Sequence, residues 1–202
     1  GTSLNAVAMT EYVEHHCAPG MSGRIIGAGE SGVIKVYRRG YGDRIEHELE
    51  GHKESCTALS VSLNGSLLAS ASDDKTARLW NLGTGDCLTV LSGHKYHVRA
   101  VSISWDGTFC FTGSDDKTVK VWDISGAIAG SNDNLGTCKH TIECQAHVLG
   151  VAAADDNDKV AVATQSRVLE VWALRLGERL NTLEGHTGRI SSVCMSHDGS
   201  TL

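Results

Sequence analysis

SASDDKTARLW, residues 70–80, and TGSDDKTVKVW, residues 112–122, are near copies of each other within a chain of 202 residues. The tryptophans that end the two copies lie 42 residues apart. A Gly-His dipeptide precedes each copy, and the distance from His52 or His94 to the closing tryptophan is 28 residues in both. Two independent marks with one spacing indicate an internal repeat, and a repeat determines architecture before any single residue does.

Weaker copies of the same pattern surround this pair. Gly185-His186 opens a further unit, and Ala146-His147 is followed by Trp172 after 25 residues rather than 28. Upstream, SGVIKVY ends at Tyr37, which takes the tryptophan position. A period near 42 residues is within the ~40 to 45 residues typical of a unit of four short strands.

Short strands joined by tight turns are predicted within each unit. In the clearest unit, apolar or alternating runs occupy residues 57–63, 67–70, 77–80 and 87–91. Asn64-Gly65 between two such runs is a strong hairpin signal, and no stretch longer than ten residues keeps a helical period. Helix should therefore be nearly absent. The small and polar stretch 125–137 predicts a surface loop, with a docking insert as the alternative.

Composition excludes several classes of protein. The net charge of −6 argues against a nucleic-acid surface, which usually carries a basic stripe. No apolar run approaches the ~18 residues of a membrane span, and no secretory signal is visible, although a chain starting at Gly1 could have lost one. Seven cysteines show no regular pairing, and Cys56, Cys110 and Cys194 align with apolar or small positions as buried free thiols do. This predicts an intracellular location, cytoplasmic or nuclear.

The pattern of Gly-His, about 28 residues and a tryptophan after an S/T-G/A-S-D-D-K-T turn resembles the WD-repeat β-propeller family. The resemblance implies an all-β fold of four-stranded antiparallel blades. Four blades are nearly complete and a fifth begins, so the chain is interpreted as a fragment of a larger, seven-bladed propeller. The approximate blades are residues 1–49, 50–91, 92–144, 145–184 and 185–202.

The same resemblance implies a buried network in each well-kept blade, made of a histidine, a hydroxyl, an aspartate and the tryptophan. Carried over by position, the residues are His52, Ser70, Asp74 and Trp80, and then His94, Thr112, Asp116 and Trp122. A closed network supplies the partners that buried polar groups need. In the unit around Trp172, Val162 and Ser166 take the hydroxyl and aspartate positions, which predicts that this network is absent there. Trp105-Asp106 falls in a hairpin and is not a closing tryptophan.

Three clusters resemble catalytic, metal or phosphate sites, but a structural role in the repeat is the stronger hypothesis for each. His94 with Asp116 resembles part of a hydrolase triad, but the same pair recurs in the preceding unit, and catalytic sites are not repeated unit by unit. Cys138, His140, Cys144 and His147 have zinc-ligand types, yet Cys144 aligns with core leucines and His147 with the Gly-His histidines. The glycine-rich stretch 27–32 lacks the Lys-Ser/Thr ending of a phosphate loop. We expect no catalytic residue, metal or cofactor.

Function is therefore expected at the rim of the propeller. Candidate partner-binding residues are Asp73, Tyr96, His97, Arg99, Asp115 and Arg189. Tyrosine and arginine are favoured interface anchors, although a solvated rim without a partner is the alternative. The leading hypothesis is a non-catalytic scaffold for protein or peptide partners, without nucleic acid or membrane. The alternatives are part of a multidomain enzyme or of a cullin-type ubiquitin-ligase receptor, the latter suggested by Trp172-Ala173-Leu174-Arg175, and an enzyme with a central-channel site.

Overall fold

Four antiparallel sheets of four strands each follow one another along the chain. The computed structural model describes residues 3–9, 23–38, 44–131, 135–154, 159–173, 177–196 and 201. Sheet 1 contains β1 (Leu4–Met9), β2 (Arg24–Gly29), β3 (Ile34–Arg38) and β4 (Ile45–Leu49). Sheet 2 contains β5 (Cys56–Val61), β6 (Leu67–Ser72), β7 (Thr76–Asn81) and β8 (Cys87–Ser92).

The second half of the chain repeats this plan. Sheet 3 contains β9 (Val98–Ile103), β10 (Phe109–Ser114), β11 (Thr118–Asp123) and β12 (Thr137–Glu143). Sheet 4 contains β13 (Val148–Ala153), β14 (Lys159–Thr164), β15 (Leu169–Ala173) and β16 (Glu178–Leu183). In every sheet the strands pair in chain order. This confirms the prediction of an all-β fold built from four-stranded blades, while the blade limits and the blade number of a whole propeller stay predictions.

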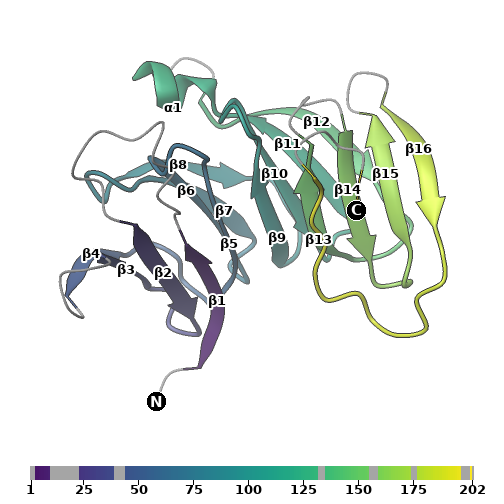
Figure 1. The fold of residues 1–202 in the computed structure, drawn as a ribbon, viewed down its shortest axis with the longest axis horizontal. Coiled ribbons are helices and arrows are strands. Elements are labelled where there is room, and N and C mark those ends of the chain that lie inside the picture. Colours follow the sequence, from purple (N-terminus) through teal and green to yellow (C-terminus); the bar gives the residue numbers. More distant parts are fainter. Residues whose placement is uncertain are drawn as a thin grey trace.

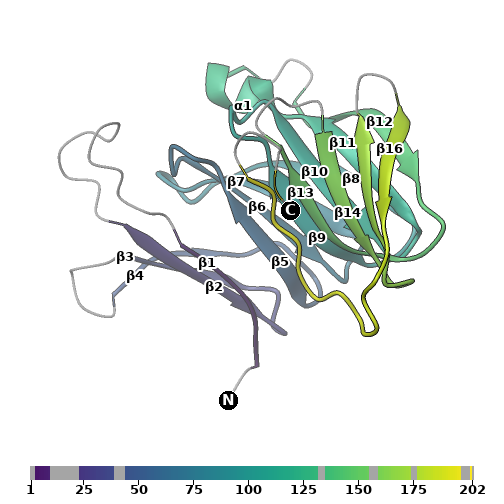
Figure 2. The same ribbon diagram turned by 45° about the vertical axis from the view of Figure 1, so that its right-hand side comes forward.

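The sheets stand side by side in an arc, as Figure 1 and the turned view of Figure 2 show. The first strands of the sheets, β1, β5, β9 and β13, contact one another in succession along the inside of the arc. Each first strand is followed outward by the other three of its sheet. The turns before these inner strands and those before the third strands therefore recur at one edge of every sheet, which we call the rim.

Apolar cores fill the spaces between neighbouring sheets. Leu79 of sheet 2 and Trp122 of sheet 3 belong to one cluster, and Phe111 of sheet 3 and Val162 of sheet 4 belong to the next. Gly113 permits this close approach, because a Cβ atom there would collide with Val148 of sheet 4. Burying these side chains against the adjacent sheet is favourable, because it removes apolar surface from water.

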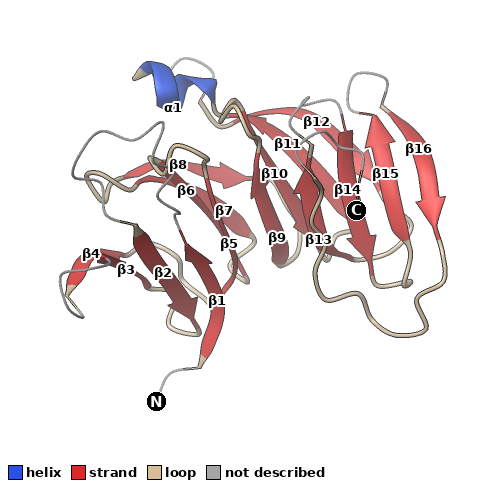
Figure 3. Cartoon of the chain, viewed as in Figure 1, coloured by secondary structure: helices blue, strands red, loops and turns tan. Residues whose placement is uncertain are grey.

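The stretch predicted as a surface loop after β11 is partly helical. Ser125–Ala129 forms the short helix α1, which Figure 3 shows in blue beside sheet 3. Ile124, fully buried, anchors its start, and Gly130 ends it with a left-handed φ of 67°. Glycine adopts this conformation without the steric cost that a side chain would bring. The prediction of a loop was therefore wrong for these five residues.

Candidate partner-binding rim

A chain of hydrogen bonds links four side chains in sheet 2. His52 Nδ1 lies 2.8 Å from Asp74 Oδ2, and His52 Nε2 lies 2.8 Å from Ser70 Oγ. An ionised carboxylate only accepts, so the imidazole donates through Nδ1, and its neutral form accepts through Nε2. The Ser70 hydroxyl then donates to His52 and accepts from Trp80 Nε1 at 2.8 Å. Every polar group of this set has a partner.

Sheet 3 repeats the same geometry with a threonine in place of the serine. His94 Nδ1 lies 2.9 Å from Asp116 Oδ2 and its Nε2 lies 2.7 Å from Thr112 Oγ1. Trp122 Nε1 donates to that hydroxyl at 2.8 Å. We call each set of four residues a tetrad: His52, Ser70, Asp74 and Trp80 in sheet 2, and His94, Thr112, Asp116 and Trp122 in sheet 3.

The tetrads hold their ionisable groups in fixed charge states. Burial lowers the pKa of His52 and His94 below the usual 6.5, by more than the adjacent aspartates raise it. Burial alone would raise the pKa of Asp74 and Asp116, but hydrogen bonds from a threonine, the histidine and a backbone N–H lower it to about 2. The histidine is thus neutral and the aspartate ionised near pH 7. All four tetrad members of each sheet are linked to one another by these hydrogen bonds.

Sheet 4 satisfies its tryptophan in a different way. Val162 stands opposite Glu170 in the register and offers no hydroxyl. Trp172 Nε1 instead donates to Glu170 Oε2 at 2.9 Å, and Arg179 Nη1 donates to Glu170 Oε1 at 3.3 Å. Glu170 is only 3% exposed, so Arg179 compensates a buried charge. Sequence reasoning missed this arrangement. The signal for it was a glutamate at the position of Arg78 and Lys120 in the near-copied stretches.

The structure corrects the alignment of His147. The backbone N–H groups of Asp73, Asp115 and Gln165 donate to the carbonyls of Ser55, His97 and His147 respectively. His147 therefore corresponds to His97 on the rim, not to the Gly-His histidines, because the connection between sheets 3 and 4 is one residue shorter. Likewise, Leu91 and Leu183 correspond to Ile142 rather than to Cys144.

The predicted burial of three cysteines is confirmed for two of them and wrong for the third. Cys56 and Cys110 are buried as predicted, but Cys194 is exposed, because the segment around it forms no strand and is not covered. Burial raises the pKa of Cys56, Cys110 and Cys144 to about 12, so these thiols stay protonated and are poor nucleophiles. Within the described residues, no group of three or more His, Cys, Asp or Glu side chains could hold a metal ion.

The predicted rim residues of sheets 2 and 3 meet in a ladder of ion pairs. Arg99 Nη1 donates to Asp73 Oδ1 and Arg99 Nε donates to Asp115 Oδ2, both at 2.8 Å. His97 Nδ1 donates to the Asp73 carbonyl at 2.8 Å. Tyr96 does not join them and is 58% exposed. Arg99 therefore ties the two sheets together, with about a third of its side chain still exposed.

The arginine ladder ends at sheet 4, where His147 Nδ1 lies 3.9 Å from Asp115 Oδ1 and a hollow opens. Leu149 occupies the second position of β13, as Arg99 does in β9, and Gln165 occupies the turn position of Asp115. Neither can extend the ladder, since an alkyl group and a neutral amide form no ion pair. The resulting hollow has a volume of about 430 Å³. It is lined by Arg99, Asp115, His147, Leu149, Gln165 and Arg189.

Three of the hollow's lining residues were predicted and three were missed. Arg99, Asp115 and Arg189 come from the sequence-based set, whereas His147, Leu149 and Gln165 do not. The missed residues are the positions where sheet 4 departs from the repeat. Asp73, His97 and Tyr96 lie beside sheets 2 and 3 and do not line the hollow. Arg189 forms no ion pair with any residue that the structure describes.

Blades of four antiparallel strands, arranged around inner strands and holding histidine, hydroxyl, aspartate and tryptophan tetrads, define a β-propeller repeat protein. The WD domain, G-beta repeat family matches residues 44–81, 85–123 and 177–202, which together make up more than half of the chain. The chain belongs to this WD-repeat family.

Several known proteins resemble the chain. A CCR4-associated factor 4 homolog of Candida glabrata is 29% identical over 144 residues, covering 71% of this chain and 19% of that protein. Mitochondrial division protein 1 of Saccharomyces cerevisiae is 28% identical over 148 residues, covering 72% and 16%. A ribosome biogenesis protein BOP1 homolog of Monosiga brevicollis is 45% identical over 42 residues, or 21% and 5%. The chain thus spans less than a fifth of the length of these relatives.

Among the described residues, no helix has the length and apolar character needed to cross a membrane.

Proposed function

We propose that this chain is a non-catalytic scaffold that binds protein or peptide partners at the rim. The observation that carries the proposal is the hollow between sheets 3 and 4, where the arginine ladder stops and Arg189 has no acidic partner among the residues that the structure describes. Arginine beside an apolar side chain such as Leu149 is an arrangement favoured at interfaces. Tyr96, half-exposed on the same rim, offers a second anchor.

Other features support a binding role over a catalytic one. The tetrads are used in structural contacts, and the buried thiols Cys56, Cys110 and Cys144 stay protonated. The name of one relative, a CCR4-associated factor 4 homolog, describes an association with another component. In the part of the chain that the structure describes, six cysteines are free, which supports an intracellular location, cytoplasmic or nuclear. The cullin-receptor alternative rests on Trp172 to Arg175, where Ala173 replaces the aspartate and Leu174 and Arg175 lie outside the described residues.

The test compares a variant that alters the hollow with one that alters the ladder. Arg189→Glu reverses the unpaired charge and should abolish co-purification of rim-dependent partners while the unfolding midpoint stays unchanged. Arg99→Glu is unsuitable alone, since it would place three carboxylates together. A control with the same charge change is Lys35→Glu on sheet 1, where the exposed ion pair with Glu48 contributes little to stability. Quantitative mass spectrometry of affinity-purified protein reads the outcome. Identical partner profiles for the wild type and Arg189→Glu would contradict the proposal.

A further inference from the structure

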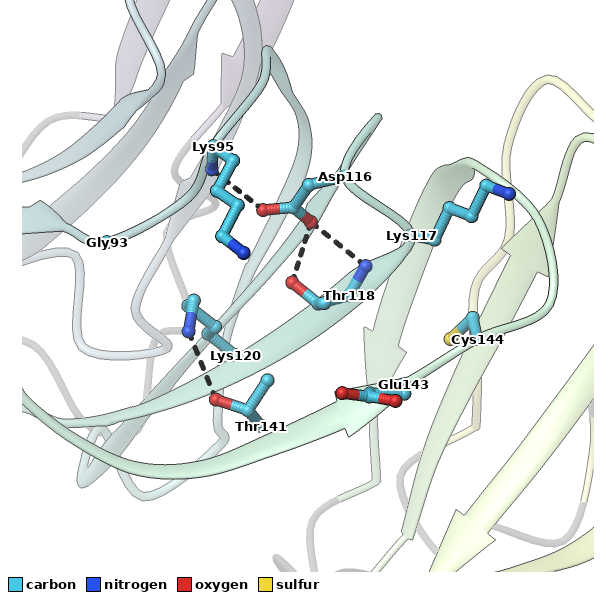
Figure 4. Close-up of a pocket in the computed structure, with 9 residues that line it drawn as sticks. All are labelled: Gly93, Lys95, Asp116, Lys117, Thr118, Lys120, Thr141, Glu143 and Cys144. Carbon is cyan, nitrogen blue, oxygen red and sulfur yellow. Dashed lines mark hydrogen bonds between the residues drawn. The ribbon is translucent and has the colours of Figure 1, made fainter.

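A second hollow lies on the outer half of sheet 3, separate from the one between sheets 3 and 4. Its floor is the face of β11 and β12 that carries Thr118 and Lys120 opposite Glu143 and Thr141 in the strand register. Lys95, from the segment before β9, and Lys117, from the turn before β11, complete the lining. Figure 4 shows the Lys95 side chain extending toward Lys120, while Lys117 extends away from them. The volume is about 390 Å³.

Among the described residues, the lysines of this hollow have no acidic partner. In the part of the chain that the structure describes, Lys95, Lys117 and Lys120 form no ion pair, and Lys120 Nζ donates only to Thr141 Oγ1 at 3.1 Å. By contrast, Lys35 and Lys139 pair with Glu48 and Asp123. Three uncompensated cations in one place are notable in a chain with a net charge of −6. They create a local positive potential.

The acidic groups nearby do not cancel this potential. Asp116 accepts hydrogen bonds from His94, from Thr118 and from the Lys95 backbone N–H, so both of its oxygens already have partners, while its negative charge remains. Glu143 forms no ion pair within the described residues and lies on the floor beside Thr141. Three lysines against these two carboxylates leave the lining with a net charge of about +1, and the excess lies at the edge, where Lys117 extends.

The near-copied sheet 2 shows why the space is open in sheet 3. There Arg78 stands where sheet 3 has Lys120, and its guanidinium carbon lies 5.9 Å from the centre of the Trp80 ring. A Cβ atom built on Gly51 would lie 2.6 Å from Arg78 Nη1, so the guanidinium packs directly on that loop. A Cβ atom built on Gly93, the counterpart of Gly51, would lie 3.8 Å from Cε, the nearest atom of Lys120. The narrower ammonium group thus leaves room that the planar guanidinium fills.

We propose that this hollow binds the phosphoryl group of a phosphorylated side chain on a protein partner. Such a group carries a charge of about −1.5 to −2 at pH 7 and three acceptor oxygens. Lys95 and Lys120 supply the donors, the Thr141 hydroxyl offers a further one, and Lys117 adds to the field at the edge. The volume also has room for the side chain that carries the phosphoryl group. This inference does not depend on the proposed role of the other hollow.

The test uses a phosphoserine peptide, its unphosphorylated twin and inorganic phosphate, titrated into the full-length protein and followed by calorimetry or NMR shifts. We expect the phosphoserine peptide to bind and Lys95→Gln to weaken it about tenfold. Lys120→Arg keeps the charge but closes the space, and should weaken binding similarly. Glu143→Gln should strengthen binding, because it removes the opposing charge. The matched control is Lys53→Gln, the sheet 2 counterpart of Lys95, which should change nothing.

The remaining outcomes overturn the proposal. Equal weakening by Lys53→Gln and Lys95→Gln would mean that overall charge, and not this hollow, attracts the peptide. Equal binding of the unphosphorylated twin would remove the phosphoryl group as the recognised feature. Binding of inorganic phosphate alone, without the peptide, would exclude a protein-borne source. An unfolding midpoint equal to that of the wild type establishes that each variant is folded, and Glu143→Gln provides a variant whose predicted effect is a gain.

Discussion

Sheets 2 and 3 keep the repeat, and sheet 4 departs from it. In the first two, His52 or His94, a hydroxyl, an aspartate and a tryptophan close a hydrogen-bond chain with every distance between 2.7 and 2.9 Å. In sheet 4 the Trp172 indole N–H donates to the carboxylate of the buried Glu170. Val162, at the position of the hydroxyl residue, packs in the apolar core.

The difference separates structural positions from binding positions. Where the repeat is kept, its polar residues contact each other, and Arg99 links adjacent sheets. Where it is lost, at Leu149 and Gln165, the ladder stops and a hollow forms. The well-marked tetrads therefore stabilise the blades, and the departures from the repeat create candidate binding surfaces.

The largest expected effect is the loss of a tetrad tryptophan. Trp122→Ala should lower the free energy of unfolding by about 3 to 5 kcal/mol, because a large side chain that is only 2% exposed leaves a cavity. Trp172→Ala should cost less, because its ring is only half-buried. Chemical denaturation of both variants measures the difference. A loss below about 1 kcal/mol for Trp122→Ala would contradict the assignment of this blade.

An intermediate effect is expected from the tetrad hydroxyl. Ser70→Ala leaves Trp80 Nε1 and His52 Nε2 without their shared partner, which should cost about 1 to 3 kcal/mol. The converse change, Val162→Thr, should give no gain, because Trp172 already donates to Glu170. Unfolding curves for the two variants provide the comparison. Stabilisation by Val162→Thr would show that sheet 4 retains a latent tetrad.

A smaller, graded effect is expected from pH. The pKa of His52 and His94 is lowered on folding, so the unfolded chain takes up protons first as the pH falls below about 6.5. Stability should thus be full above that pH and decline below it. A second decline should begin below 3.8, since folded Asp74 and Asp116 keep a pKa of about 2. Urea unfolding midpoints measured across this pH range test the order of the two declines. His94→Asn should make the first decline smaller. Constant stability from about pH 8 to 5 would contradict the assignment of neutral histidines.

Much of the fold could be predicted from the sequence, because the repeat shows which residues of successive units correspond to each other. The runs at 67–70 and 77–80 fall within β6 and β7, and the Asn64-Gly65 turn separates β5 from β6. α1 escaped prediction because five residues are too short for a periodic signal, and a buried Ile124 with a left-handed Gly130 determines it.

The binding surfaces were less accessible to sequence reasoning. The sequence predicted Arg99 to be an exposed interface anchor. Its ion pairs with Asp73 of sheet 2 and Asp115 of sheet 3 become visible only in the folded structure. His147 was assigned to the wrong histidine position, because a one-residue deletion between sheets is ambiguous without the inner-strand hydrogen bonds. The hollow lined by Lys95 and Lys120 exists because Lys120 leaves open a space in sheet 3 that Arg78 fills in sheet 2. The spacing of the repeats in the sequence does not show this difference.

The most direct test of the central claim is a pair of double-mutant cycles measured by chemical denaturation. One cycle combines Thr112→Val with Trp122→Phe, and the other combines Val162→Ala with Trp172→Phe. If the tetrad holds the blade together, the first pair should show a coupling free energy of about 0.5 to 3 kcal/mol and the second a value near zero. A negligible coupling between Thr112 and Trp122, or equal couplings in both sheets, would contradict it.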